Sequence, residues 1–319
     1  MLKRQFVKKI FVSTAILFSL LLMYLIPTKE ENVLKDVKQE LSYVNKNLDT
    51  ENIYLLDKNN LLARTKVVVE NKDVTKRAQE LLEILIKNGK EENKIPSGFT
   101  AVLPSDTKII TVEYKDSLLK VNFSKELMSD SKNEEKIVES IVYTLTSIDE
   151  IKKVIIYVDG EILSKLPSTK INLPSTLDRS YGINKEYNIS SYKNVNSVIV
   201  YYLKENNDEY YYVPVTKYVN DNREKIKIIV EELTSTPIYN TNLMSFLNSN
   251  TKLLATEQEV DTMFLVFNEY IFSDMDEQNI LEEVIYTISL SVADNYDVKE
   301  VVFEYENEEI YKSVLKSIE

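Results

Sequence analysis

The chain has no histidine and no cysteine among its 319 residues. Without imidazole or thiolate it cannot form a Ser-His-Asp or Cys-His catalytic arrangement, a zinc or haem site with the usual ligands, or a disulfide. Glycine occurs only four times, which leaves no glycine-rich loop for a P-loop or a dinucleotide-binding fold. The composition therefore predicts a protein with no cofactor and no metal site, and it weighs against an enzyme.

Basic residues are the minority, with 39 Lys+Arg against 51 Asp+Glu and a formal net charge of −12. Four of the cations lie in residues 1–9, so residues 10–319 carry −16. A body of this charge repels phosphate backbones, and the sequence shows no basic stripe that would compensate. We therefore expect no nucleic-acid partner.

An uncharged apolar run of 17 residues, IFVSTAILFSLLLMYLI, covers residues 10–26. This length lies at the lower edge of what crosses a bilayer as a helix, and the basic residues 1–9 before it place the amino terminus in the cytoplasm. We predict a single-pass signal anchor in the cytoplasmic membrane, with the bulk of the chain extracytoplasmic. A cleaved signal peptide is the alternative, although no small-x-small pair follows the run. A lipoprotein anchor is excluded, because the chain has no cysteine to modify.

Residues 27–50 are predicted to form a stalk helix. Their apolar positions follow a short heptad-like spacing of 3, 4, 3 and 4, at Leu34, Val37, Leu41, Val44 and Leu48. The seam fits either an amphipathic helix that rests on the first domain or a dimerising stalk.

The rest of the chain contains one motif twice. The segment LPSDTK at 103–108 returns as LNSNTK at 247–252, an offset of 144. The segment IVYTL at 141–145 returns as VIYTI at 284–288, an offset of 143. Packing fixes elements while loops tolerate insertions, so spacing that is nearly constant indicates a duplicated domain.

In each copy the sequence pattern predicts two strands, a helix, two strands, a helix and a strand. This order indicates an α+β fold. Helices should cover one face of a small mixed sheet in each copy. We place the first domain at 51–166, a linker with limited structure at 167–196, and a divergent second domain at 197–319. The second ends in a predicted helix, Glu308–Lys316. Because each copy has a complete set of elements, each is expected to fold alone.

The motif residues of both copies resemble the GerM domain. In the first copy the signature comprises Leu103, Thr107, Lys108, Phe123, Tyr143, Thr144, Asp159 and Gly160. In the second it comprises Thr251, Phe267 and Tyr286, while Asn248 stands in place of proline and Glu306-Asn307 in place of Asp-Gly.

The resemblance implies a non-enzymatic extracytoplasmic module of spore-forming bacteria that acts in sporulation or spore germination. It also implies a fold similar to the ring-building domains of secretion-type assemblies. We therefore expect a membrane-anchored scaffold that assembles with envelope or sporulation membrane proteins, or with further copies of itself.

The sequence nominates one interaction surface, on the first hairpin of the second copy. Strand alternation would place Tyr201, Tyr210 and Tyr212 on its solvent face. Such rings bind a partner protein or, as the alternative function, the glycan of the cell wall.

Carboxylate pairs in the sequence do not predict a catalytic or metal site. Glu134-Glu135 and Glu282-Glu283 are adjacent on the polar faces of predicted helices, so their side chains diverge instead of facing one cleft. Asp274 and Asp276 lack the loop of a calcium site.

The full-length protein should stay in the membrane fraction after a high-salt wash. Salt screens ionic contacts but does not extract a helix that is buried in hydrocarbon. Fractionation with immunoblotting measures this, and release of a soluble species that begins near Thr28 would show a cleaved signal peptide instead.

Overall fold

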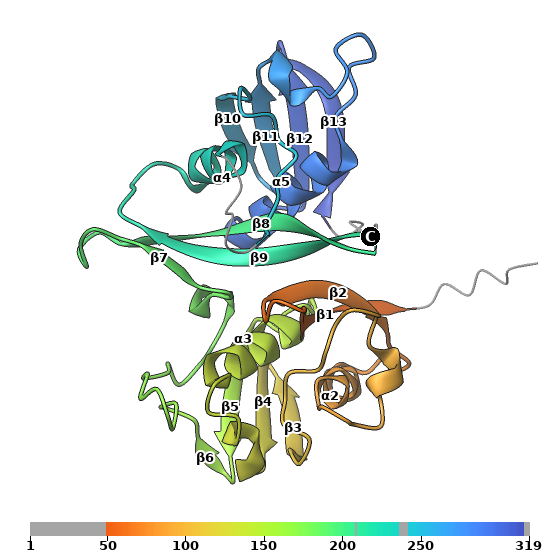
Figure 1. Cartoon of the computed structure of the whole chain (residues 1–319), viewed down its shortest axis with the longest axis vertical. Helices are drawn as coiled ribbons and strands as arrows, with labels where there is room; N and C mark the ends of the chain where they lie inside the picture. Colours follow the sequence, from red (N-terminus) through yellow and green to blue (C-terminus); the bar gives the residue numbers. More distant parts are fainter. Residues whose placement is uncertain (1–48, 208, 236–241, 316–319) are drawn as a thin grey trace, which may run out of the picture. The chain divides into compact units, whose positions relative to one another are not determined.

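The computed structural model describes residues 49–207, 209–235 and 242–315 (Figure 1). The predicted basic terminus 1–9, the anchor 10–26 and nearly all of the stalk 27–50 lie outside the described residues. Within the described part of the chain, no helix combines the length and the apolar character needed to cross a membrane. The described residues belong to one compact unit.

The first copy, called repeat 1 below, has the predicted order of elements, which confirms the ββαββαβ pattern, and one short strand follows it. The elements are β1 Thr50–Leu56, β2 Leu62–Val68, α2 Val74–Ile84, β3 Ile109–Lys115, β4 Leu118–Phe123, α3 Glu134–Leu145, β5 Lys153–Val158 and β6 Glu161–Ile162. The side chain of Asp73 caps α2, because it accepts a hydrogen bond from the Lys76 N–H at 3.0 Å.

The second copy, repeat 2, follows the same order. Its elements are β8 Asn196–Asn206, β9 Glu209–Val219, α4 Lys225–Thr234, β10 Leu253–Glu259, β11 Thr262–Phe267, α5 Glu282–Asn295, β12 Glu300–Tyr305 and β13 Glu308–Val314.

The predicted terminal helix Glu308–Lys316 is wrong, since its described part is strand β13, paired antiparallel with β12. The turn before it decides this: Glu306 and Asn307 have φ angles of 52° and 63°. Two successive left-handed residues form a tight hairpin turn, which sends the chain back along β12. Asp159 and Gly160 make the same turn between β5 and β6, with φ angles of 48° and 84°. The last strand of repeat 2 therefore has a shorter counterpart in repeat 1.

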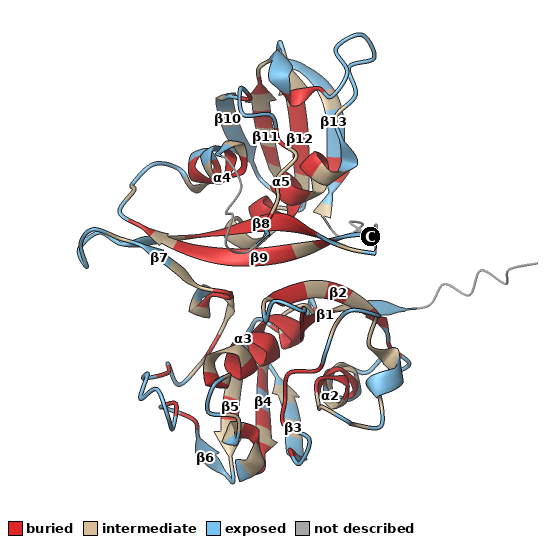
Figure 2. Cartoon of the chain, in the orientation of Figure 1, coloured by how far each residue is buried: buried red, intermediate tan, exposed pale blue. Residues whose placement is uncertain are grey.

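Each repeat has a small mixed sheet, ordered β3-β4-β5-β6 in repeat 1 and β10-β11-β12-β13 in repeat 2. In both sheets the two central strands are parallel and the outer pairs are antiparallel. Alternate residues of the central strands are buried under the helices, as the red segments of β4 and β11 show (Figure 2).

The first hairpin of each repeat does not join the small sheet of its own repeat. The two hairpins instead join one five-stranded sheet, whose fifth strand comes from the linker and in which β2 of repeat 1 pairs antiparallel with β9 of repeat 2 (Figure 1). Helix α3 contacts both β1 and β5, and helices α4 and α5 both contact β8. The core of repeat 1 also takes in Ile199, Tyr201 and Leu290 from repeat 2.

The linker has more structure than the sequence predicts. It contains a 3-10 turn at Arg179–Tyr181 and the strand β7, Glu186–Asn188, which runs parallel to β9. Isolated bridges join Val154 to Leu177 and Lys165 to Asn172. Because Ile183 and Asn184 are buried, a domain boundary at 166 or 196 separates segments that pack together.

The first residue of the turn between β10 and β11 carries more backbone strain than the equivalent residue of repeat 1. Val260 has a φ of 49° and is 90% exposed, and Asp116, at the equivalent position, has a φ of 50°. A β-branched side chain is strained in the left-handed region, whereas Asp and Asn tolerate it.

Val260→Asn should raise the free energy of unfolding by about 1 kcal/mol, because Asn adopts the left-handed conformation with less strain. The reciprocal control, Asp116→Val, should lower it by a similar amount. Urea unfolding measures both changes, provided that the unfolding free energy falls with urea concentration at the wild-type slope. A loss of stability in Val260→Asn would contradict the assignment of strain.

Candidate functional site

The region where the two repeats meet, called the seam below, begins at the edge between β2 and β9. The two strands pair at Arg64 and Tyr212. Two residues further along β9, Pro214 has no N–H to donate to a neighbouring strand. The linker residue Asn184 fills this place: its side-chain N–H groups donate to the carbonyls of Leu62 and Pro214, both at 2.8 Å, and its Oδ1 accepts from the Leu62 N–H at 2.9 Å.

A buried ion pair crosses the seam. The Nζ of Lys204 lies 2.7 Å from Oδ2 of Asp57, and the two side chains are only 2% and 1% exposed. Tyr211 donates its hydroxyl to the same carboxylate oxygen at 2.9 Å. The other carboxylate oxygen accepts from the backbone N–H groups of Asn59 and Leu61, both at 2.8 Å. One carboxylate therefore holds the β1–β2 turn of repeat 1 and two side chains of repeat 2.

These contacts determine how the Asp57 carboxyl titrates. Burial raises its pKa, but the hydrogen bonds from Lys204, Leu61 and Tyr211 outweigh burial, and the net pKa lies below its usual range. A carboxyl with a depressed pKa stabilises the fold above its unfolded pKa. That stabilisation is lost as the pH falls through the lower folded pKa.

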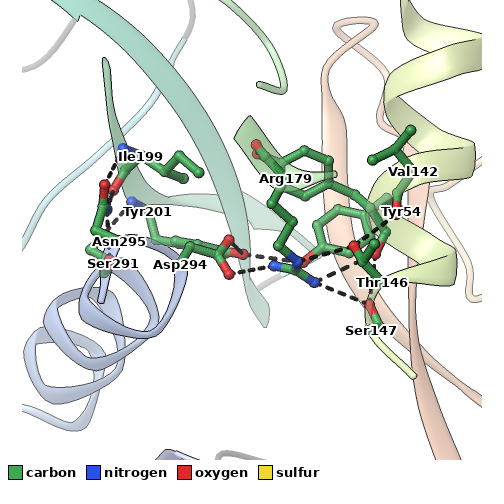
Figure 3. A network of polar contacts seen from close by, with 11 residues as sticks. Tyr54, Val142, Thr146, Ser147, Arg179, Ile199, Tyr201, Ser291, Asp294 and Asn295 are labelled. Carbon is green, nitrogen blue, oxygen red and sulfur yellow. Dashed lines mark hydrogen bonds and ion pairs between the residues drawn. The ribbon is translucent and has the colours of Figure 1, made fainter. Parts of the chain in front are cut away.

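A second polar network crosses the seam around Arg179 of the linker (Figure 3). Its guanidinium pairs with Asp294 of α5. On the repeat 1 side it donates to the hydroxyl of Thr146 at 3.2 Å and lies 5.0 Å from the ring centre of Tyr143. Tyr201 donates its hydroxyl to the other Asp294 oxygen at 2.7 Å.

Two helices hold the outer edges of the shared sheet with side chains. On α3, Thr144 accepts from the Tyr54 N–H at 3.0 Å, and Ser140 donates to the Tyr54 carbonyl at 2.7 Å. On α5, Ser291 accepts from the Tyr201 N–H at 2.9 Å, and Asn295 bonds both backbone groups of Ile199 (Figure 3). Unpaired strand edges invite pairing with other chains, and these bonds satisfy part of each edge.

Most of the signature side chains predicted from the sequence are buried and structural. Leu103, Phe123, Tyr143, Thr144 and Phe267 are fully buried, and Thr107 and Thr251 are each 5% exposed. Tyr286 is half-buried, and Lys108, Asp159 and Gly160 are exposed. Tyr143 donates its hydroxyl to the Arg179 carbonyl at 2.9 Å, so the helix signature supports the seam directly.

The predicted tyrosine surface is wrong for Tyr201, which is 1% exposed. Its hydroxyl lies 3.1 Å from that of Tyr54, because the face that alternation assigned to solvent lies against repeat 1. Tyr210 is 44% exposed and packs edge-on against Phe246. Tyr212 is half-buried against Tyr286. The three rings do not form one open surface.

The carboxylates noted in the sequence have structural roles. Glu134 is 1% exposed, so the prediction that it lies on a polar helix face is wrong. Its carboxylate accepts from the backbone N–H groups of Ser168 and Thr169 at 2.7 and 3.1 Å. Asp274 accepts from the N–H groups of Asp276 and Glu277 within its own loop. In the described ranges no three acidic side chains lie close enough to hold a metal ion.

Sequence reasoning missed the residues that build the seam: Asp57, Arg179, Asn184, Lys204, Asp294 and Asn295. One weak signal was present. Lys204 follows the apolar run Val198–Leu203 without a break, and a charge that continues a buried strand needs a partner.

A family model described as Germane: Sporulation and spore germination matches residues 52–164 and again 199–311. The spore germination protein GerM of Bacillus subtilis (strain 168) is 34% identical over 255 residues, which are 78% of this chain and 69% of that protein. The chain belongs to the GerM family. The solved tandem GerMN domains of the sporulation protein GerM from Bacillus subtilis match with a TM-score of 0.74 at 31% identity, over 82% of this chain and 92% of that one. This chain is therefore a GerM-like protein of sporulation or spore germination with two tandem GerMN domains.

The family match shows that equivalent residues of the two GerMN domains contact each other. The matched stretches start 147 residues apart. Tyr54 and Tyr201 are also 147 apart, as are Asp57 and Lys204, and both pairs are in contact. Contact between equivalent positions is the mark of a two-fold interface. The seam is thus an approximate two-fold pairing inside one chain, in which Asp on one side faces Lys on the other.

Lys204→Met should lower the free energy of unfolding by about 3–5 kcal/mol at neutral pH, because it leaves the Asp57 carboxylate buried without its cation. The matched control is Lys227→Met, whose pair with Glu224 is about half exposed and should contribute no more than about 0.5 kcal/mol. Denaturant unfolding of both variants measures the difference.

The pH dependence provides a second readout of the same change. Without Lys204, the hydrogen bonds from Leu61 and Tyr211 still oppose the effect of burial but the cation no longer does, so the folded pKa of the Asp57 carboxyl rises above that of the wild type and protonation restores part of the lost stability. The deficit of Lys204→Met should therefore shrink as the pH falls. A deficit that is independent of pH would point to lost packing of the lysine chain instead of a lost ion pair.

Proposed function

We propose that this GerM-family protein is a membrane-anchored extracytoplasmic scaffold that assembles with other proteins of the spore-forming cell envelope. Residues 10–26 are its anchor, and its partners are sporulation membrane proteins or further copies of the chain. It acts by binding and not by catalysis.

The observation that carries the proposal is the distribution of exposed apolar side chains. In repeat 1 they are Val68, Ile110 and Ile162. In repeat 2 they are Tyr210, Leu254, Val260, Tyr270, Met275, Leu281, Tyr311 and Val314. Exposed apolar side chains that gather on one part of a surface mark a binding site.

Three of the exposed apolar side chains of repeat 2 lie close together in the sequence. Tyr270, Met275 and Leu281 are 43%, 53% and 40% exposed, and all come from the segment between β11 and α5. The end of this segment, residues 277–279, lines a surface hollow together with the β12–β13 turn. The segment is longer than its counterpart in repeat 1, with residues 268–281 against 124–133, so it gives repeat 2 a surface that repeat 1 lacks.

The alternative function, glycan binding by the tyrosine hairpin, has no such support. It required Tyr201, Tyr210 and Tyr212 on one open face, and Tyr201 is buried in the seam.

Tyr270→Ser with Met275→Ser should abolish the cross-linked complexes that the full-length protein forms in sporulating cells, with little change in thermal midpoint, because neither ring nor thioether is buried. The matched control in repeat 1 is Ile110→Ser with Ile162→Ser, which removes apolar side chains of similar exposure and should leave the complexes intact. In-cell cross-linking followed by mass spectrometry measures both, and a wild-type chain that is monomeric throughout sporulation would contradict the scaffold.

A further inference from the structure

A stacked pair of tyrosine rings joins β7 to β9. Tyr187 and Tyr218 are register partners on these strands, with ring centres 4.8 Å apart and planes within 9°. Tyr187 is 66% exposed, whereas Tyr218 is half-buried. One face of the outer ring is therefore covered by Tyr218, and the other is open to solvent as a flat aromatic platform.

The backbone next to the inner ring has a conformation that favours glycine. Gly182 has a φ of +83°, and a Cβ on it would lie 3.0 Å from the Tyr218 hydroxyl oxygen. A side chain at this position would meet both a strained backbone and the inner ring. The inner ring therefore lies against a position that favours glycine.

A lysine ammonium group already lies over a neighbouring ring, that of Tyr181. The Nζ of Lys185 lies 3.5 Å from the ring centre of Tyr181, and the same ammonium pairs with Glu135 at 3.4 Å and Glu139 at 3.3 Å. The pKa of Tyr187 is raised by burial and then by the charges of Glu135 and Glu139, so both carboxylates act on the outer ring as well. The platform thus extends a cluster in which an ammonium group sits between an aromatic face and carboxylates.

The open ring offers the same chemistry to a group from another molecule. The negative face of an aromatic ring attracts ammonium and guanidinium groups. Glu139 is nearly buried, but the Glu135 side chain is 34% exposed, so its carboxylate is within reach of solvent. Repeat 2 carries 24 Asp+Glu against 9 Lys+Arg, and a field of this sign draws basic partners to the surface.

We propose that the Tyr187–Tyr218 stack docks an arginine or lysine side chain from a basic segment of a partner protein, with Glu135 as the counter-ion. The inference rests on the proposed scaffold function, since it names the chemistry of one partner. It uses a surface separate from Tyr270 and Met275, so the two can fail independently.

The test is fluorescence anisotropy of the detergent-solubilised full chain with a labelled Gly-Arg repeat peptide, near physiological salt. Tyr187→Ala should weaken binding about threefold to tenfold, the range of a partly desolvated cation–π contact. Tyr187→Phe keeps the aromatic face and should stay within about twofold of the wild type. Tyr192→Ala removes a ring that is 95% exposed and should leave binding unchanged. All three variants should keep the wild-type thermal midpoint.

Two results would overturn the proposal. Equal peptide binding by Tyr187→Ala and Tyr192→Ala would show that the acidic surface attracts the peptide without a site. Binding of N-acetylglucosamine oligomers that Tyr187→Ala abolishes, with peptide binding unaffected, would assign the platform to a sugar. Neither result bears on the in-cell complexes that depend on Tyr270 and Met275.

Discussion

The ion pair between Asp57 and Lys204 is the constraint on which the arrangement of the two repeats depends. Both side chains are almost fully removed from water, so either charge is costly wherever the other is absent. The Asp57 carboxylate also closes the β1–β2 turn through Asn59 and Leu61. Lys204 also donates to the side-chain oxygen of Asn59 in the same turn, so the turn of one repeat and the strand of the other are satisfied together, and a different arrangement of the repeats would separate the carboxylate from its cation.

The seam also explains why the two copies are not interchangeable. Across an approximate two-fold pairing, identical residues at position 57 and its equivalent would place like charges in contact, and Asp facing Lys removes that conflict. Pro214 makes the two sides of the seam differ in the backbone as well. It removes an N–H donor from the edge of β9, and the side chain of Asn184 takes the position where a strand would otherwise pair. The linker is thus the third component of the seam. The seam therefore distinguishes the first copy of the duplicated domain from the second.

Local pattern predicted the local structure well, and tertiary contacts explain where it failed. The repeat, the strand and helix order and the mixed sheets follow from periodicity that each segment carries itself. The seam does not, since Asp57 and Lys204 are 147 residues apart and each looks ordinary in its own segment. Tyr201 is a second example. Strand alternation predicts on which face of the hairpin its ring lies, but it does not predict that the other repeat covers this face. At β13, seven residues were too few to separate helix from strand, and the left-handed turn at Glu306 and Asn307 decided the matter.

The family signature of this chain lies mostly in its interior. Tyr143 and Thr144 are buried, and their polar atoms bond the Arg179 carbonyl and the Tyr54 N–H. Residues with such roles maintain the fold and the seam. Under the proposed scaffold function, partner recognition then falls to exposed residues such as Tyr270 and Met275 of repeat 2 and Tyr187 of β7. Because these residues are exposed, they can change with little cost to the core.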